Sequence, residues 1–167
     1  MSELSIIERA QSFAVERHSD QTYGNNLPYA WHLGKVADLA MRLGYSEPVQ
    51  AAAWLHDTVE DTDTHITEIR QKFGNRIAIM VDGVTYTEED RQNGVDKINK
   101  ARTNPGSQAL KFCDSSVNFS ASALDGAPER MGQWKATVER YGTFITRLHH
   151  DLPTPDDVDA WMLGIED

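Results

Sequence analysis

A short stretch in the first half of the chain determines how the rest of the sequence is interpreted. It reads Trp54-Leu55-His56-Asp57-Thr58-Val59-Glu60-Asp61-Thr62. An imidazole and a carboxylate stand side by side after an apolar run, and two further acids follow within about one helical turn. Because four groups that can bind a metal or transfer a proton lie within six residues, the stretch predicts a chemical site rather than a solvated helix face.

Helical periodicity dominates the sequence on both sides of this stretch. Apolar residues at helix spacing predict helices over residues 6–15, 28–43, 47–56, 66–73, 107–124 and 128–150, and a short last helix from residue 155. Residues 75–84 fit a helix, although Ile77, Ile79 and Val81 also fit a short strand. Because no strand pattern is convincing elsewhere, we predict an all-α fold.

Turn and capping residues define several helix ends. Pro28 is expected to open the second helix near its first turn, and Gly44 to end it. Hydroxyl groups between Thr62 and Thr67 are expected to cap the helix over residues 66–73, which Gly74 stops.

The second half of the chain carries fewer such signals. Residues 88–103 are polar and expected to be mostly exposed, and Asn104-Pro105-Gly106 is expected to form a turn. Thr154, followed by a proline and two acids, is typical of a capped start for the last helix.

The composition is that of an ordinary globular protein. The chain has 167 residues, of which 40% are hydrophobic and 25% charged, and we expect residues 1–167 to form a single domain with its own core. The single cysteine, Cys113, excludes an internal disulfide and indicates a reducing compartment. No apolar run approaches the roughly 20 residues that span a bilayer, and we do not expect the acidic N-terminal residues to form a signal peptide. We therefore expect a cytoplasmic protein without a membrane partner.

The net charge narrows the class of partner. A formal charge of −10 repels a nucleic-acid backbone, and no basic stripe stands out against it. A small phosphorylated substrate is compatible with this charge if a divalent cation inverts the field locally. An acidic chain that acts on phosphate therefore indicates a bound metal.

Two residues outside the opening stretch can complete a metal site. His32 lies in the middle of a predicted helix, and Asp114 ends an apolar run where an unpaired charge is costly to bury. With His56 and Asp57 they provide the nitrogen and oxygen donors that divalent metals prefer. Adjacent residues on a regular helix point about 100° apart, so His56 and Asp57 can share a metal only where the helix ends.

Glu60 follows His56 by four residues and lies on the same helix face. Its carboxylate could act as general base or acid on a water molecule. Each of these residues also has a structural interpretation. Glu60, Asp61 and Asp63 are acids of a kind favoured at a helix N-terminus, and Asp114 could pair with Lys111 three residues earlier.

The remaining candidates are interpreted as structural. They are His18, His65, the pair His149-His150 and Cys113, which is expected to be a small buried hydrophobic residue rather than a nucleophile.

Taken together, these residues resemble the HD-domain phosphohydrolases, and most closely the hydrolase domain of RelA/SpoT-type alarmone enzymes and the free-standing small alarmone hydrolases. The resemblance extends from about residue 13 to residue 118. The stretches that carry it are Ala14-x3-His18-x2-Gln21, Pro28-Tyr29-x2-His32, Ala52-x2-Leu55 with the following residues 56–62, Phe73-Gly74, Val84-Thr85 and Leu110-Lys111-x2-Asp114-x3-Asn118.

The resemblance implies an HD-type helical bundle with one divalent ion, usually Mn2+, whereas the donor set would also accept Zn2+, Fe2+ or Co2+. The ligands that it implies are His32, His56, Asp57 and Asp114. Glu60 and Asp61 would activate water or shuttle protons, and Tyr29 and Asn118 would line the nucleotide pocket. The family reaction removes the 3′-pyrophosphate from guanosine tetra- or pentaphosphate, the alarmones of the stringent response.

The sequence departs from this family at three positions that are usually basic. They carry Tyr23, Gly24 and Ser115. Tyr23 could still stack on a purine, but it brings no charge. At roughly 1–3 kcal/mol for each charge-assisted contact, the loss could weaken the binding of a polyanion by orders of magnitude. The candidate cations for compensating this loss are Lys35, Lys97, Lys100, Arg102 and Lys111.

Three functions are therefore compatible with the sequence. The first is hydrolysis of a guanosine or adenosine 3′,5′-bisphosphate alarmone. The second is hydrolysis of another nucleotide phosphate, and the third is nucleotide binding without catalysis. The sequence leaves the oligomeric state open, and Trp134, Trp161 and Met162 are more typical of a core than of an interface.

Overall fold

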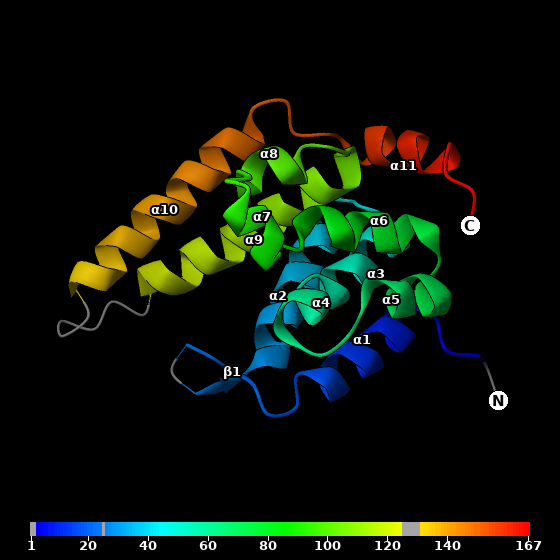
Figure 1. Cartoon of the computed structure of the whole chain (residues 1–167), viewed down its shortest axis with the longest axis horizontal. Coiled ribbons are helices and arrows are strands. Elements are labelled where there is room, and N and C mark those ends of the chain that lie inside the picture. The colour runs from blue at the N-terminus through cyan, green and yellow to red at the C-terminus, as the bar shows by residue number, and fades with distance from the viewer. Residues whose placement is uncertain (1–2, 25, 125–130) are drawn as a thin grey trace.

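Helices form nearly all regular structure in the residues that the structure describes, namely 3–24, 26–124 and 131–167 of a computed structural model (Figure 1). The helices are α1 (Ile6–Arg17), α2 (Tyr29–Arg42), α3 (Glu47–Leu55), α4 (Thr58–Asp61), α5 (Ile66–Phe73), α6 (Asn75–Val84), α7 (Glu88–Gln92), α8 (Lys97–Ala101), α9 (Pro105–Leu124), α10 (Met131–His149) and α11 (Pro155–Leu163). The prediction of an all-α fold is confirmed.

One short antiparallel pair of strands was not predicted. Strand β1 (Thr22–Tyr23) pairs with β2 (Leu27–Pro28), and Tyr23 lies opposite Leu27. The pairing closes a hairpin between α1 and α2. A two-residue strand leaves no alternating pattern in the sequence, so periodicity could not detect it.

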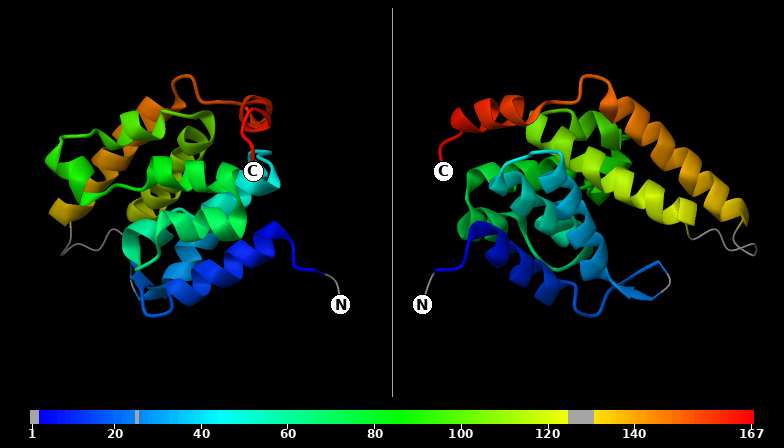
Figure 2. Two further views of the ribbon diagram at one scale, coloured as in Figure 1. Left: turned by 45° about the vertical axis from the view of Figure 1, so that its right-hand side comes forward. Right: turned by 180° about the vertical axis from the view of Figure 1, so that it is seen from behind.

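Helix α3 lies at the centre of the bundle. It contacts α1, α2, α6 and α9, and the view from behind in Figure 2 shows α1, α2 and α3 side by side. Its residues Ala51, Ala52 and Ala53 are completely buried, and their small side chains let neighbouring helices approach closely. As a result, the end of α3 at His56 lies inside the protein.

Several predicted helix ends are confirmed. Helix α2 begins at Tyr29, directly after Pro28, and Gly44 follows it with a φ of 86°, a conformation that favours glycine. The Thr154 side chain accepts a hydrogen bond from the Asp157 N–H and caps α11. The prediction of a hydroxyl cap for α5 is wrong, because the His65 side chain accepts from the Thr67 N–H instead.

The segment from residue 88 to residue 103 is mostly exposed, as predicted, but it forms the short helices α7 and α8. Ile98 and Ala101 of α8 are completely buried and pack with Leu148 of α10. The expected turn at Asn104-Pro105-Gly106 is instead the start of α9. Asn104 accepts a hydrogen bond from the Ser107 N–H at 2.7 Å, and Pro105 suits a first turn because it has no N–H to pair.

Helices α9 and α10 lie side by side, and the C-terminal end of α9 and the N-terminal end of α10 project beyond the remaining helices (Figure 1). The predicted start of the second of these helices at residue 128 lies outside the described residues. Met162 is buried and Trp161 packs against the core, as expected, whereas the side chain of Trp134 is not among those described. Cys113 is fully buried, in agreement with its predicted role.

No described helix combines the length and the apolar character that crossing a membrane requires.

Helices α6 and α9 cross at a point where glycine is required. A Cβ atom added to Gly83 would overlap the Ser107 Oγ and lie 2.7 Å from its Cβ. The Ser107 hydroxyl cannot easily move away, because it donates a hydrogen bond to the Met80 carbonyl at 2.9 Å.

We therefore expect Gly83→Ala to lower the free energy of unfolding by about 1–3 kcal/mol, as overpacking does. Gly142→Ala is the matched control. Gly142 also lies in a helix, but its added Cβ would be 3.5 Å from Phe119, an ordinary contact distance. Urea denaturation of both variants measures the difference, and equal stabilities would contradict a close crossing at Gly83.

Helices α7 and α8 are connected by an ion pair. Lys100 Nζ donates to Asp90 Oδ2 at 2.6 Å. This hydrogen bond, with that from the Thr87 N–H, lowers the pKa of Asp90 to about 2. Because the folded pKa lies below the unfolded value of about 3.9, the ionised carboxylate stabilises the fold above pH ~4. That stability is lost as the pH falls towards 2.

The Asp90→Asn variant should therefore lose about 1 kcal/mol of unfolding free energy at pH 7, the usual scale for a partly exposed pair. The difference from the unmodified protein should shrink between pH 5 and pH 3. Chemical denaturation over this range measures it, with the exposed Asp20→Asn as control. A difference that stays constant with pH would show that the charge of Asp90 is not responsible.

Candidate metal centre

Four predicted residues meet at one point inside the bundle. Each of His32, His56, Asp57 and Asp114 offers one nitrogen or oxygen atom, and these atoms all lie within 4.8 Å of one another. They come from α2, from the junction of α3 and α4, and from α9. Both imidazoles and Asp114 are almost completely buried. The sequence places these residues as many as 82 positions apart, and the fold brings them together.

The junction between α3 and α4 explains how adjacent residues reach one centre. Helix α3 ends at Leu55, and α4 begins at Thr58. Between them, Asp57 leaves regular helix geometry with φ −99° and ψ −3°. The His56 Nε2 and the Asp57 Oδ2 are consequently 2.9 Å apart, as the prediction of a chain bend requires.

The protonation of His56 provides a test of whether a cation fits this cluster. Its Nδ1 lies 2.7 Å from the Ala53 carbonyl oxygen, which can only accept, so Nδ1 carries the proton. When the ring is neutral, the Nε2 lone pair faces Asp57 Oδ2 at 2.9 Å and Asp114 Oδ1 at 3.4 Å. This buried nitrogen has no hydrogen-bond partner among the described residues. Acceptors that face one another in this way fit a cation between them.

The charge balance of the cluster supports the same interpretation. Burial alone would lower the pKa of His56, but Asp57 and Asp114 outweigh it and raise that pKa well above its ordinary value. The cluster therefore attracts positive charge. Two imidazole nitrogens and two carboxylates are donors of a divalent metal site, and the cluster suggests one.

Asp114 is held by two further side chains of α9. Lys111 Nζ donates to its Oδ2 at 2.6 Å, and Asn118 Nδ2 donates to its Oδ1 at 2.8 Å. Burial opposes ionisation of Asp114, but Lys111 holds its pKa well below the ordinary value. The pairing with Lys111, which the sequence offered as an alternative to metal binding, thus coexists with a place in the cluster.

The two tyrosines near the cluster contact its members directly. Tyr29 donates its hydroxyl hydrogen to Asp57 Oδ2 at 2.6 Å, and burial together with Asp57 raises the pKa of this phenol, which keeps it protonated. The Tyr23 ring stacks on His32 with centroids 4.6 Å apart, and its hydroxyl donates to Asn118 at 2.8 Å. Side-chain contacts of this kind leave no signal in the sequence.

The two predicted catalytic acids lie on α4 beside the cluster and are exposed to solvent. Glu60 Oε1 accepts a hydrogen bond from the Tyr86 N–H at 2.6 Å. Partial removal from water raises the pKa of Glu60 above its ordinary value, although the Tyr86 N–H opposes the shift. Asp61 Oδ2 accepts from the Gln21 side chain at 3.0 Å.

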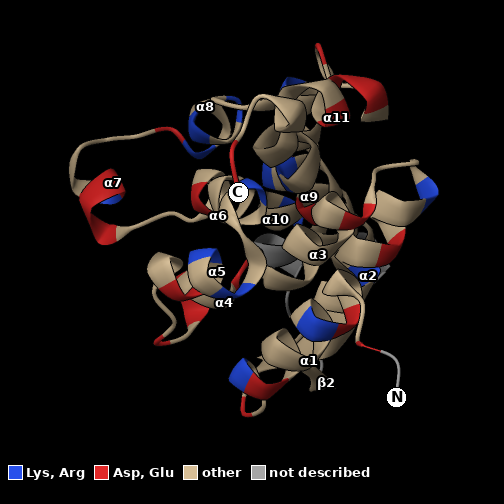
Figure 3. Cartoon of the chain, turned by 90° about the vertical axis from the view of Figure 1, so that its right-hand side faces the viewer, with Lys and Arg blue, Asp and Glu red and all other residues tan. Residues whose placement is uncertain are grey.

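Most cations that could compensate for the missing basic residues already have partners. Lys111 is bonded to Asp114, Lys100 to Asp90, and Arg102 lies 3.9 Å from Asp151. Lys97 lies over the ring of Tyr86 at 4.6 Å, and therefore close to Glu60. In the view of Figure 3, the basic positions of the described residues are scattered along the ribbon among acidic ones and form no continuous stripe.

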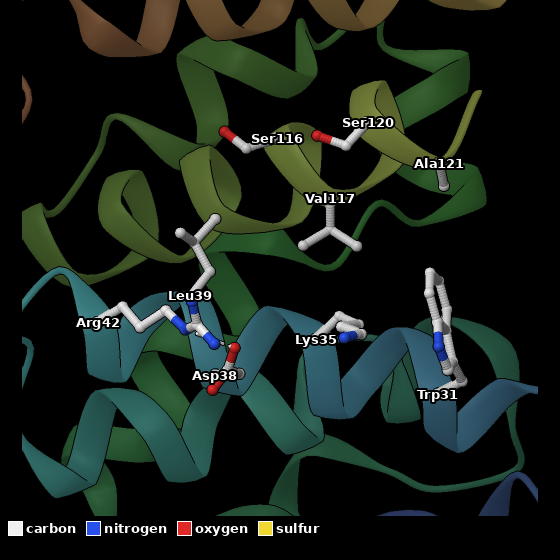
Figure 4. A pocket seen from close by; sticks show the side chains of 9 residues that line it. All are labelled: Trp31, Lys35, Asp38, Leu39, Arg42, Ser116, Val117, Ser120 and Ala121. Atoms are coloured by element: carbon white, nitrogen blue, oxygen red, sulfur yellow. Dashed lines mark ion pairs between the residues drawn. The ribbon is translucent and has the colours of Figure 1, made fainter. Parts of the chain in front are cut away.

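Lys35 lies in a groove between α2 and α9, with a volume of about 500 Å³, together with Trp31 and Val117 (Figure 4). The Tyr23 ring contacts both Trp31, which lines this groove, and His32 of the cluster. Of the three positions that are usually basic in the resembling family, Ser115 is completely buried and adds nothing to the surface of the site.

Comparisons with known proteins agree with this geometry. The sequence profile of the HD domain family matches residues 10–112. The guanosine-3′,5′-bis(diphosphate) 3′-pyrophosphohydrolase of Aquifex aeolicus is 35% identical over 148 residues, which cover 85% of this chain and 21% of that protein. The GTP pyrophosphokinase of Streptomyces coelicolor is 38% identical over 154 residues, covering 88% of this chain and 18% of that protein. The chain thus spans about a fifth of the length of these relatives.

A solved structure shares the fold. A metazoan ortholog of SpoT, described as hydrolysing ppGpp and acting in starvation responses, superposes with a TM-score of 0.66 at 21% sequence identity. The match covers 90% of this chain and 95% of that one. The HD-type helical bundle that the sequence predicts is therefore confirmed.

We expect the purified protein to bind one divalent ion and Asp57→Ala to lose it, because that carboxylate faces both imidazoles. Elemental analysis and thermal unfolding with and without a chelator measure this. At a hundredfold excess over the dissociation constant, bound metal adds about 2.7 kcal/mol of stability.

Asp63→Ala is the control for this experiment. Asp63 belongs to the same acidic segment, but its side chain is 93% exposed. Retention of the full metal content by Asp57→Ala would contradict the assignment of the centre.

Proposed function

The chain belongs to the HD domain family, and we propose that it is a metal-dependent phosphohydrolase that acts on a small nucleotide. The observation that carries this proposal is the buried group of two imidazoles and two carboxylates, within 4.8 Å of one another, beside two solvent-exposed acids. A purely structural cluster would not need acids at its mouth. Their presence favours an enzyme over a binding module without catalysis.

The proposed reaction is removal of the 3′-pyrophosphate by water from a guanosine or adenosine 3′,5′-bis(diphosphate) alarmone. Its support is the identity with the Aquifex aeolicus pyrophosphohydrolase over 85% of this chain and the fold shared with a protein described as hydrolysing ppGpp. We propose that residues 1–167 act as one hydrolase domain.

The proposed ligands of the metal are His32, His56, Asp57 and Asp114, and we propose Mn2+ as the ion. Zn2+, Fe2+ and Co2+ are the alternatives that this donor set accepts. A bound divalent ion would supply charge for the phosphoryl oxygens and lower the pKa of water. Tyr29 and Lys111 hold the two carboxylates in place through their hydrogen bonds.

Glu60 is the proposed proton acceptor of the reaction. The Tyr86 N–H fixes one of its oxygens, which leaves the second oxygen to accept a proton from a water molecule. A raised pKa suits this role, because a stronger base accepts the proton more readily at neutral pH. Asp61 would shuttle the proton, and Tyr23, Tyr29 and Asn118 would line the nucleotide pocket.

A second candidate, hydrolysis of another nucleotide phosphate, is favoured by one specific observation. Tyr23, Gly24 and Ser115 stand where the resembling family is usually basic, and Ser115 is buried. A substrate with fewer charges than a tetraphosphate would need fewer cationic contacts. The choice between the candidates depends on the length and position of the phosphate chain.

We expect the protein with Mn2+ to release pyrophosphate from guanosine or adenosine tetraphosphate, as resolved by anion-exchange chromatography. Glu60→Gln should reduce kcat by roughly 10²–10⁴-fold, the usual contribution of a general base. Metal content should not change, because Glu60 is not a proposed metal ligand and glutamine can still accept the hydrogen bond from the Tyr86 N–H.

Glu89→Gln, a change at an exposed acid of α7, is the matched control and should leave kcat unchanged. Turnover of other nucleotides but of neither tetraphosphate would replace the first candidate with the second. Unchanged kcat in Glu60→Gln would remove this residue from the mechanism.

A further inference from the structure

His18 has an environment that a structural role at the end of α1 does not explain. It follows the last residue of α1 and is only 3% exposed. Its Nδ1 lies 2.6 Å from Gln21 Oε1, whereas its buried Nε2 has no hydrogen-bond partner in the described part of the chain. Leaving a buried polar atom unpaired is unfavourable, so an apolar side chain would serve better if this position only filled space.

Gln21 connects His18 to Asp61, and the contact with Asp61 fixes the direction of both hydrogen bonds. A carboxylate can only accept a hydrogen bond. The Gln21 atom that lies 3.0 Å from Asp61 Oδ2 is therefore the amide nitrogen, which donates to it. The amide oxygen of Gln21 then faces His18, and His18 Nδ1 must carry a proton. The two hydrogen bonds therefore run in the same direction: His18 donates to Gln21, and Gln21 donates to Asp61.

The backbone reinforces this orientation. The Gln21 carbonyl oxygen accepts a hydrogen bond from the Tyr29 N–H at 3.0 Å. This bond connects Gln21 to the first residue of α2, the helix that also carries His32. Gln21 is therefore held at its backbone and at both atoms of its amide.

A second set of contacts connects His18 to the proposed metal ligands. The His18 ring stacks on Tyr29, with centroids 4.9 Å apart and an angle of 20° between the ring planes. The Tyr29 hydroxyl donates to Asp57 Oδ2 at 2.6 Å. One imidazole thus supports Asp61 through Gln21 and Asp57 through Tyr29.

We propose that His18 and Gln21 are positioning residues that aim the Asp61 carboxylate at the reaction site and coordinate its orientation with that of Asp57. This inference rests on the proposed function, because it assumes that Asp61 takes part in hydrolysis. It assigns no direct contact with the substrate to either residue. Loss of the Gln21 amide would leave the Asp61 carboxylate exposed and free to rotate.

The first test compares Gln21→Leu with Gln11→Leu, a change at an exposed glutamine of α1. Gln21→Leu removes both amide contacts at nearly constant volume. We expect kcat to fall by roughly 10–100-fold, the usual effect of losing an orienting partner. The metal content should equal that of the Gln11→Leu control, because the amide contacts none of the proposed ligands.

The second test separates the two sets of contacts at His18. His18→Phe keeps a ring against Tyr29 but removes the donor to Gln21, so kcat should fall as in Gln21→Leu while metal affinity is maintained. His18→Asn keeps a donor near the position of Nδ1 but removes the stacked ring, so metal affinity should fall by roughly 10-fold or more. Titration with Mn2+ alone measures the affinity.

Nitrogen NMR of the imidazoles gives a readout that does not require activity. The hydrogen bonds among His18, Gln21 and Asp61 predict that His18 carries a proton on Nδ1 in the unmodified protein. In Gln21→Leu, the proton should no longer prefer Nδ1 over Nε2. Protonation of His18 at Nε2 alone would overturn the proposal, even if the protein turned over no nucleotide.

Activity measurements distinguish the remaining outcomes. A kcat of Gln21→Leu within twofold of the control would overturn the positioning role and leave the proposed hydrolase intact. A parallel loss of metal and activity in that variant would also overturn it, because the residue would then be structural. An inactive unmodified protein with the predicted tautomer would reject the hydrolase and retain the hydrogen-bond chain.

Discussion

The mutual repulsion of buried acceptors is the constraint on which this structure depends. Two carboxylates and the lone pair of His56 face one another in a space from which water is largely excluded. Such an arrangement is unfavourable unless cations or hydrogen-bond donors surround it. Lys111, Asn118 and Tyr29 provide those donors. The two carboxylates still carry more negative charge than Lys111 neutralises, and this excess favours a divalent ion. The contact between His32 Nε2 and Asp114 Oδ1 at 3.1 Å joins α2 to α9, and the Tyr29 hydroxyl joins α2 to the junction of α3 and α4.

The central position of α3 follows from the same constraint. His56 must reach the interior without its polar atoms being stranded, and the Ala53 carbonyl at the end of α3 satisfies its Nδ1. A helix end offers such free carbonyl groups, whereas the middle of a helix does not. The small side chains of α3 allow α1, α2 and α6 to surround it, which buries that end. Close packing of the helices and the hydrogen bond of His56 therefore both require α3 to lie at the centre of the bundle.

The sequence predicts the features of the fold and of the site that depend on the spacing of residues close together in the chain. The stretch around His56 predicts two of the four clustered residues, whereas His32 and Asp114 are predicted from their places in other helices and from the resemblance to the HD-domain phosphohydrolases. Helical spacing predicts most helices because burial repeats with the helix period. It predicts neither α7 nor α8, because such short helices depend on caps such as Thr87 and Asp96. Contacts between distant side chains, such as Tyr23 with Asn118, have no local signature. The sequence therefore predicts a structural role for His18, although the partners of His18 connect it to the site.

The distribution of positive charge bears on how an acidic protein could attract a phosphorylated substrate. A formal charge of −10 opposes the approach of any anion, and Lys100 and Lys111 are already paired with carboxylates. If the chain hydrolyses nucleotides as proposed, the attraction must originate mainly from the metal, which concentrates its charge at the reacting phosphate. Lys97 and Lys35 lie on different elements and have no ion-pair partner among the described residues. Discrimination between substrates would then depend on which phosphate groups reach these two lysines.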